Sequence, residues 1–123
     1  LPLLRQSSSG RIIMISSVTG PQMAMRQQPI YATAKAALVG LVRSLSLDEA
    51  KFGITTNAVL PGWIATDTQS EFENMQGSHS PLGRSGKPEE IASLVTWLAS
   101  SSSSYLTGQC LVVDGGNSIA EEQ

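Results

Sequence analysis

Hydrophobic residues along this chain fall into three short apolar runs separated by longer segments with helical spacing. The three runs occupy residues 11–16, 54–60 and 109–113, contain β-branched residues, and border glycine or proline. Runs of this kind are typical of strands that are buried on both faces of a parallel sheet. The sequence therefore predicts three strands at these positions.

Two helices are predicted between the strands. In residues 30–52, apolar side chains recur at helical spacing at Ala34, Leu38, Leu41 and Leu45, and Gly53 follows as a cap. A second helix opens at residues 87–91, with proline and two glutamates in its first turn. We interpret the serine run 100–104 as its solvated end.

The order strand, helix, strand, helix, strand predicts an α/β fold with a parallel, doubly wound sheet of three strands and two crossover helices. Ligands of such sheets bind beyond the carboxyl ends of the strands. Ser17 and the Pro61-Gly62 turn follow two of these ends, and Tyr31 begins the helix that leaves the same edge. We expect these three segments to meet on one rim.

Residues 63–87 form a long polar stretch that we interpret as a loop acting as a lid. Three large apolar side chains interrupt it: Trp63, Phe72 and Met75. They fit the wall of a substrate pocket, and equally well an anchor between the loop and the core.

Tyr31 and Lys35 are four residues apart, so on a helix they share one face about a turn apart. A phenol has a reference pKa of about 10, and a nearby ammonium lowers that value. Together with the hydroxyl of Ser17 they form a proton-transfer set for carbonyl and alcohol chemistry. By itself, the pair also fits an exposed tyrosine beside a solvated lysine.

Composition argues against several other classes of protein. The net charge is -2 and only 15% of residues are charged, without a basic patch, so neither a nucleic-acid nor a membrane partner is expected. The single cysteine, Cys110, excludes an internal disulfide and a cysteine metal cluster, and no metal site is expected. We interpret Cys110 as a small core residue, the single histidine, His79, as solvated, and the compartment as cytoplasmic.

Six motifs in order resemble the short-chain dehydrogenase/reductase family across about residues 4–118. They are Ile15-Ser16-Ser17, Tyr31-Ala32-Thr33-Ala34-Lys35, Thr56-Asn57-Ala58-Val59-Leu60-Pro61-Gly62, Gly86-Lys87-Pro88-Glu89-Glu90-Ile91-Ala92, Tyr105-Leu106-Thr107-Gly108 and Val113-Asp114-Gly115-Gly116. Each motif is weak singly, but six in order are specific. The resemblance implies a partial Rossmann-like sheet, which is three-layered (α/β/α) in the full-length family.

The resemblance also implies roles for individual residues. Tyr31 is expected to be the general acid/base, Lys35 to lower its pKa and bind the nicotinamide ribose, and Ser17 to polarise the substrate oxygen. The turn Pro61-Gly62-Trp63-Ile64-Ala65-Thr66 is expected to hold the nicotinamide carboxamide, through the backbone of Ile64 and the hydroxyl of Thr66. The expected reaction is hydride transfer between NAD or NADP and a small-molecule carbonyl or secondary alcohol, as in 3-oxoacyl reductases or sugar and polyol dehydrogenases.

The resemblance covers only the C-terminal half of that family, so residues 1–123 are expected to be that half of a single Rossmann-type domain. The 123 residues contain no Gly-x-Gly-x-x-Gly motif, and the residue that separates NAD from NADP belongs to the other half. The segment between Ser17 and Tyr31 is one residue longer than the commonest spacing, and Met14 replaces a frequent asparagine. A homo-oligomer, dimer or tetramer, is expected through helix 30–52 and through the third strand with its preceding helix.

Two alternatives to a reductase remain open. The chain fits a catalytically inactive, oligomerising remnant, because its edge strand and helices lack neighbours. Related enzymes with Tyr-x-x-x-Lys perform epimerisation or dehydration on the same fold. We further interpret Asn57 and Asp114 as structural, Asn57 bonding to neighbouring backbone and Asp114 stabilising a turn.

Overall fold

A parallel sheet of three strands forms the centre of the computed structural model, which describes residues 1–121. The strands are β1 (Arg11–Ile15), β2 (Thr55–Pro61) and β3 (Cys110–Val113), in the order β1-β2-β3. In register, Ile13 lies opposite Asn57 and Val59 lies opposite Leu111. All three predicted strands are confirmed, with ends that differ by one residue.

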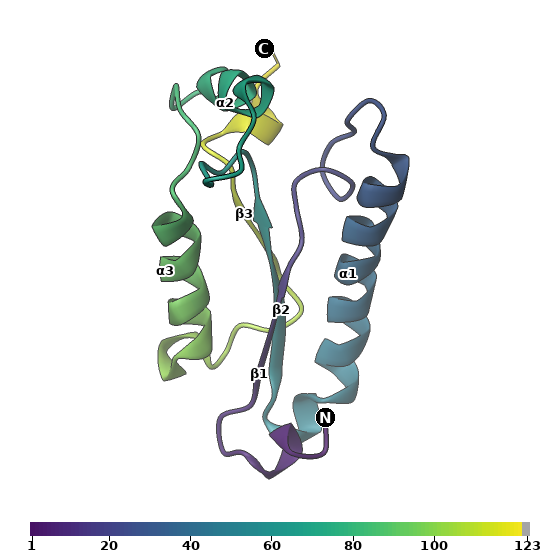
Figure 1. Ribbon diagram of the computed structural model, residues 1–123. Helices are drawn as coiled ribbons and strands as arrows, with labels where there is room; N and C mark the ends of the chain where they lie inside the picture. The colour runs from purple at the N-terminus through teal and green to yellow at the C-terminus, as the bar shows by residue number, and fades with distance from the viewer. Residues whose placement is uncertain (122–123) are drawn as a thin grey trace.

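Helices cover both faces of this sheet. Helix α1 (Pro29–Asp48) packs on one side against β2, and α3 (Pro88–Ala99) packs on the other against β1 and β2 (Figure 1). The predicted α/β class, with a parallel sheet between two crossover helices, is confirmed. Short 3-10 helices lie at Leu4–Gln6, Ala50–Phe52, Ser101–Ser103 and Asn117–Ile119.

The ends of both predicted helices differ from the structure. Helix α1 stops at Asp48, and Gly53, at φ 72°, caps the 3-10 turn after it and not α1 itself. The serine run is also more than a solvated end, because Ser103 is buried and its hydroxyl donates to the carbonyl of Leu98 at 2.9 Å.

The prediction of a loop across residues 63–87 is wrong in its middle, where Glu71–Ser78 forms helix α2. Its N-terminus carries a capping box: the Ser70 hydroxyl accepts from the Glu73 amide, and the Glu73 carboxylate accepts from the Ser70 amide. The Ser-x-x-Glu signal is present in the sequence, but few apolar residues follow it, so helical periodicity does not reveal the helix.

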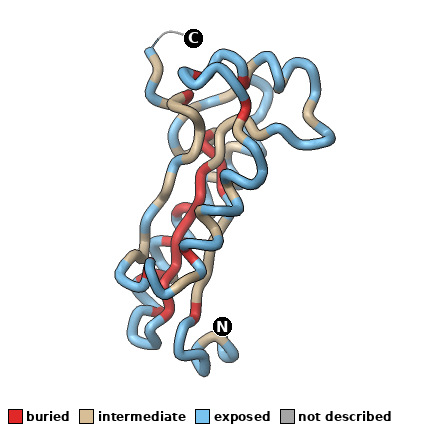
Figure 2. Tube along the Cα trace, turned by 90° about the vertical axis from the view of Figure 1, so that its left-hand side faces the viewer, coloured by how far each residue is buried: buried red, intermediate tan, exposed pale blue. Residues whose placement is uncertain are grey.

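The core lies along the central strand. Six of the seven residues of β2 are buried, and the buried part of the trace follows this strand (Figure 2). Val18, Val42, Ala58 and Leu60 form the buried cluster, and half-buried Cys110 packs against it, as predicted.

The structural roles predicted for Asn57 and Asp114 are confirmed. The side-chain Nδ2 of Asn57 donates to the Leu106 backbone carbonyl at 2.8 Å, and its Oδ1 accepts from the Gln109 backbone amide at 3.1 Å. The Asp114 carboxylate accepts from the amides of Gly116 and Ser118 in the following turn. His79 is exposed, in line with its interpretation.

Helix α1 is long and apolar enough to cross a membrane by length and composition, with 20 residues and a mean hydropathy of 1.3. A single helix of this kind is weak support for a span, because core helices of soluble proteins meet the same criteria. Here α1 packs against β2. The absence of a membrane partner stays a prediction.

Candidate functional site

A cavity of about 660 Å³ lies at the carboxyl ends of β1 and β2. All seven residues that the sequence analysis assigned to a site line it: Ser17, Tyr31, Lys35, Pro61, Gly62, Ile64 and Thr66. The parallel sheet brings the first and second strand ends to one edge, and α1 starts beside them. The expected convergence on one rim is thus present.

Ser17 is the second residue after β1, where backbone hydrogen bonds to β2 continue past the end of the strand. The amide of Ser16 donates to the Val59 carbonyl at 2.8 Å, and the amide of Val18 donates to the Pro61 carbonyl at 3.0 Å. Ser17 is only 8% exposed, and its hydroxyl oxygen accepts from the Thr19 amide at 3.1 Å. Its hydroxyl proton stays available to an acceptor such as a substrate oxygen, since this bond uses only a lone pair.

Tyr31 and Lys35 occupy the first two turns of α1. The Lys35 ammonium donates to the Ile15 carbonyl at 3.0 Å and lies 5.6 Å from the centroid of the Tyr31 ring. Tyr31 is 44% exposed. Gly20, at φ 104°, lets the loop between β1 and α1 approach this helix closely, because a Cβ at this position would lie 2.3 Å from the Ala32 carbonyl oxygen.

The turn after β2 is held from two sides. The Gly62 amide donates to the Val113 carbonyl at 3.0 Å, and a Cβ on Gly62 would lie 2.7 Å from the Cβ of Asp114. On the other side, Trp63 and Ala65 exchange backbone hydrogen bonds with Gly86, both at 2.8 Å. Ile64, which lines the cavity, is therefore held between these two backbone bonds.

Two carboxylates near the rim are held in their charged form. Hydrogen bonds from the Ser70 amide and then its hydroxyl lower the pKa of Glu73, which lines the cavity. Burial acts to raise the pKa of Asp114, but hydrogen bonds from Ser118 and Gly116 outweigh it and hold that pKa below its usual range. Within residues 1–121, no group of three or more potential metal ligands is present.

Sequence reasoning missed most of the side wall of the cavity. Ten further polar and apolar residues line it: Thr19, Met23, Ala24, Met25, Arg26, Gln28, Gln69, Glu73, Gln76 and Asn117. The only signal for the first six is their position between Ser17 and Tyr31. Of the three large apolar residues in the polar stretch, Trp63 and Phe72 line the cavity, whereas Met75 is not among its lining residues.

Comparison with known proteins places this geometry in a family. A family model described as enoyl-(acyl carrier protein) reductase matches residues 1–118. Oxidoreductase UcpA of Salmonella typhimurium is 40% identical over 134 residues, covering 98% of this chain and 51% of that protein. Tropinone reductase homolog At1g07440 of Arabidopsis thaliana is 43% identical over 123 residues, covering 96% of this chain and 46% of its own length.

Solved structures agree with the sequence comparison. Acetoin dehydrogenase YohF of Salmonella typhimurium superposes with a TM-score of 0.84 at 42% identity, over 97% of this chain and 47% of that structure. Aldohexose dehydrogenase of Thermoplasma acidophilum gives a TM-score of 0.87 at 35% identity, over 97% and 52%. The chain spans about half the length of these relatives. On these matches, the chain belongs to the short-chain dehydrogenase/reductase family.

Proposed function

We propose that the chain is the C-terminal half of an oxidoreductase that transfers a hydride between NAD(P)(H) and a carbonyl or secondary alcohol. The observation that carries this proposal is that Ser17, Tyr31 and Lys35 share one cavity with the 61–66 turn. A hydroxyl, a phenol and an ammonium around one space suit proton transfer to or from an oxygen atom.

In this proposal Tyr31 gives its proton to a ketone oxygen, or takes one from an alcohol, while Ser17 donates a hydrogen bond to the same oxygen. Lys35 stabilises the phenolate form of Tyr31. NAD(P)(H), when bound, supplies or accepts the hydride.

The residues fit the nicotinamide end of such a cofactor. An ammonium has three N–H donors and Lys35 uses one of them on Ile15, which leaves two for ribose hydroxyls. The exposed Thr66 hydroxyl, 3.3 Å from that of Thr68, and the backbone of Ile64 are available for a carboxamide.

The substrate is proposed to be a small carbonyl compound or alcohol. Four large apolar side chains, Met23, Met25, Trp63 and Phe72, line the cavity beside the charged residues Arg26 and Glu73. This mixture supports a substrate with both apolar and polar parts. The names of two structural relatives, acetoin dehydrogenase and aldohexose dehydrogenase, favour a small hydroxy-ketone or a sugar.

The test is Tyr31→Phe in the intact protein, with Tyr105→Phe as matched control. Tyr105 is fully exposed and lies outside the cavity. We expect Tyr31→Phe to lower kcat for ketone reduction about 10²- to 10⁴-fold, because a positioned general acid contributes that much. Tyr105→Phe should leave kcat unchanged. Unaltered ketone reduction by Tyr31→Phe would refute the proposal. If the protein instead converts an alcohol to its epimer or to an alkene without net hydride transfer, the epimerase or dehydratase alternative would be favoured.

Assembly and location complete the proposal. Ile30 and Leu47 of α1 are more than four-fifths exposed, and β1 pairs only with β2 among the described residues. These surfaces support a homo-oligomer or contact with further parts of a longer protein. We propose that the protein is cytoplasmic and forms a dimer or tetramer. The molar mass of the native protein in solution would test the number of subunits. Folding of the isolated chain without cofactor binding would favour the inactive-remnant alternative.

A further inference from the structure

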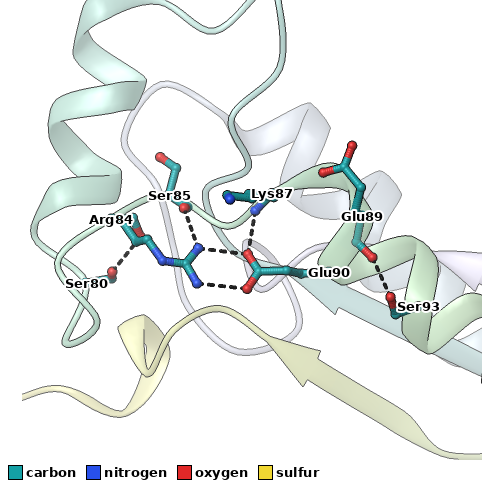
Figure 3. A network of polar contacts seen from close by, with 7 residues as sticks. All are labelled: Ser80, Arg84, Ser85, Lys87, Glu89, Glu90 and Ser93. Atoms are coloured by element: carbon teal, nitrogen blue, oxygen red, sulfur yellow. Dashed lines mark hydrogen bonds and ion pairs between the residues drawn. The ribbon is translucent and has the colours of Figure 1, made fainter.

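Residues 84–87, which we term the strap, run between α2 and α3 and contact three parts of the fold: α3, α2 and the turn after β2. Arg84 and the Lys87 amide both bond to the Glu90 carboxylate of α3 (Figure 3). Ser85 lies against Gly77 of α2, and Gly86 bonds to the turn after β2. A short segment that contacts so many elements is well placed to set their relative positions.

Glu90 fixes both ends of the strap. Its two carboxylate oxygens each accept from a different guanidinium nitrogen of Arg84 at 2.8 Å, and Oε2 also accepts from the Lys87 amide at 2.7 Å. The Arg84 guanidinium also donates to the Ser85 carbonyl at 3.1 Å. The side-chain hydrogen bonds from Arg84, followed by the Lys87 amide, lower the pKa of Glu90 to about 2. The fork-to-fork pair therefore persists throughout the neutral range.

On one side the strap holds the turn proposed to bind the cofactor. The Gly86 amide donates to the Trp63 carbonyl and the Ala65 amide donates to the Gly86 carbonyl, both at 2.8 Å. Ile64 lies between these two bonds, so Gly86 sets the direction of its backbone groups. A hollow of about 80 Å³ separates the turn from α3 and is lined by Ile64, Arg84 and Glu90, among others. Side-chain packing alone does not fill this space.

On the other side the strap holds α2 over the cavity. The Gln69 side-chain amide donates to the Ser85 hydroxyl at 3.0 Å. A Cβ on Gly77 would lie 1.9 Å from that hydroxyl oxygen, so α2 rests directly on Ser85. Phe72 and Gln76 of α2 line the cavity.

We propose that the Arg84–Glu90 pair is a positioning device that aligns the backbone of Ile64 with the nicotinamide end of the dinucleotide. The inference rests on the proposed function. The pair itself is almost half exposed, and exposed ion pairs contribute little to global stability. Its effect is therefore local, on the turn after β2 and on α2.

The first test compares two ligands on the intact protein. NADH or NADPH contains nicotinamide, whereas ADP-ribose or its 2'-phosphate lacks it. In Arg84→Gln, the Kd of the reduced dinucleotide should rise about three- to tenfold, because the backbone of Ile64 is no longer aligned with the nicotinamide. The Kd of the matching ADP-ribose should stay within about twofold, and Arg84→Lys, which keeps the charge without the fork, should fall between.

Two control variants match the charge changes. Glu89→Gln removes a neighbouring carboxylate that makes no drawn contact in Figure 3, where Glu89 bonds to Ser93 through its backbone carbonyl only. Arg43→Gln removes the guanidinium of an exposed residue of α1. Neither should alter the ratio of the two dissociation constants, while Glu90→Gln should alter it as Arg84→Gln does. Equal weakening of both ligands, or no weakening of either, would overturn the positioning role.

A second test needs no ligand. Hydrogen exchange of the Ala65 and Gly86 amides reports the two bonds that the strap makes to the turn. Arg84→Gln should accelerate exchange at these amides about three- to tenfold, with amides of β2 unchanged. Unchanged exchange at both amides would refute the inference even if the protein binds the cofactor. Accelerated exchange in a protein that binds no dinucleotide would support the device and refute the proposed function instead.

Discussion

The ammonium of Lys35 donates a hydrogen bond to the backbone carbonyl of Ile15, at 3.0 Å. The Ser16 hydroxyl donates in turn to the Lys35 carbonyl at 2.8 Å. These two bonds tie the second turn of α1 to the end of β1. The ammonium consequently lies 5.6 Å from the centroid of the Tyr31 ring at a fixed place on the rim.

Replacing Lys35 by methionine should therefore impair catalysis without unfolding the protein. Lys35→Met removes both the charge beside Tyr31 and the proposed ribose contact, so we expect kcat/KM for ketone reduction to fall about 10²-fold or more. Lys51→Met is the matched control, because the Lys51 ammonium lies 5.3 Å from the Phe52 ring and outside the cavity. Steady-state kinetics of the intact protein measure both. Wild-type kcat/KM in Lys35→Met would contradict the role of this ammonium.

The arrangement of the strands, and with it the rim of the site, is predictable because short apolar runs of parallel strands carry a strong local signal. Ser17, Tyr31 and the Pro61-Gly62 turn follow from that arrangement, since strand ends in a parallel sheet share one edge. Helix α2 is not predictable in this way, because its capping box precedes a segment with little apolar periodicity.

The wall of the cavity depends on loop conformation, which the apolar pattern does not encode. Gln27 adopts φ 61°, a left-handed conformation that is uncommon for a residue other than glycine. Its two neighbours, Arg26 and Gln28, both line the cavity. Asn117 joins them from the far end of the chain, at a distance in sequence that no local pattern predicts.

Among the polar residues of the sheet, Asn57 is the one whose replacement we expect to lower the free energy of unfolding most. Asn57 is 1% exposed, and its side chain bonds to the Leu106 carbonyl and the Gln109 amide. Asn57→Ala removes both part-buried hydrogen bonds, leaves their backbone groups without these partners, and should lower the free energy of unfolding by about 2–4 kcal/mol. Asn74→Ala on the exposed side of α2 is the control and should change it by less than about 0.5 kcal/mol. Urea denaturation measures both variants, and equal stability of the two would contradict the argument.

Acid should destabilise the protein partly through Glu49. The Arg5 guanidinium bonds to this carboxylate at 2.6 and 2.8 Å, and this hydrogen bonding lowers the pKa of Glu49 below its ordinary 4.5. A lowered folded-state pKa means that the stabilisation is fully present above about pH 4.5 and is lost as the pH falls through the folded value.

The urea midpoint of Glu49→Gln should therefore fall less steeply than wild type when the pH is lowered from 5 to 3. Asp67→Asn, which removes an exposed loop carboxylate, serves as the control and should keep the wild-type slope. At pH 7, Arg5→Gln should be less stable than Glu49→Gln, because it leaves a carboxylate at 2% exposure without its partner. A wild-type slope in Glu49→Gln would show that the pair does not contribute.

Two glycine-to-alanine changes should have opposite effects, because their surroundings differ. At Gly40 in α1, an added Cβ meets nothing within 4 Å, whereas at Gly77 in α2 it would lie 1.9 Å from the Ser85 hydroxyl oxygen. Gly40→Ala should raise the free energy of unfolding by up to about 1 kcal/mol through helix propensity. Gly77→Ala should lower it by about 1–3 kcal/mol, since α2 must move off Ser85.

Thermal or urea denaturation of Gly40→Ala, in the isolated chain and in the intact protein, distinguishes two states of the exposed face of α1: open to solvent, or covered by another surface. Stabilisation by Gly40→Ala in both would mean that this part of the face is open to solvent, which contradicts an oligomer interface there. Stabilisation in the isolated chain but destabilisation in the intact protein would mean that another surface packs against Gly40, as a homo-oligomer through α1 requires. Gly77→Ala should be destabilising in both, because the clash with Ser85 lies within the chain itself.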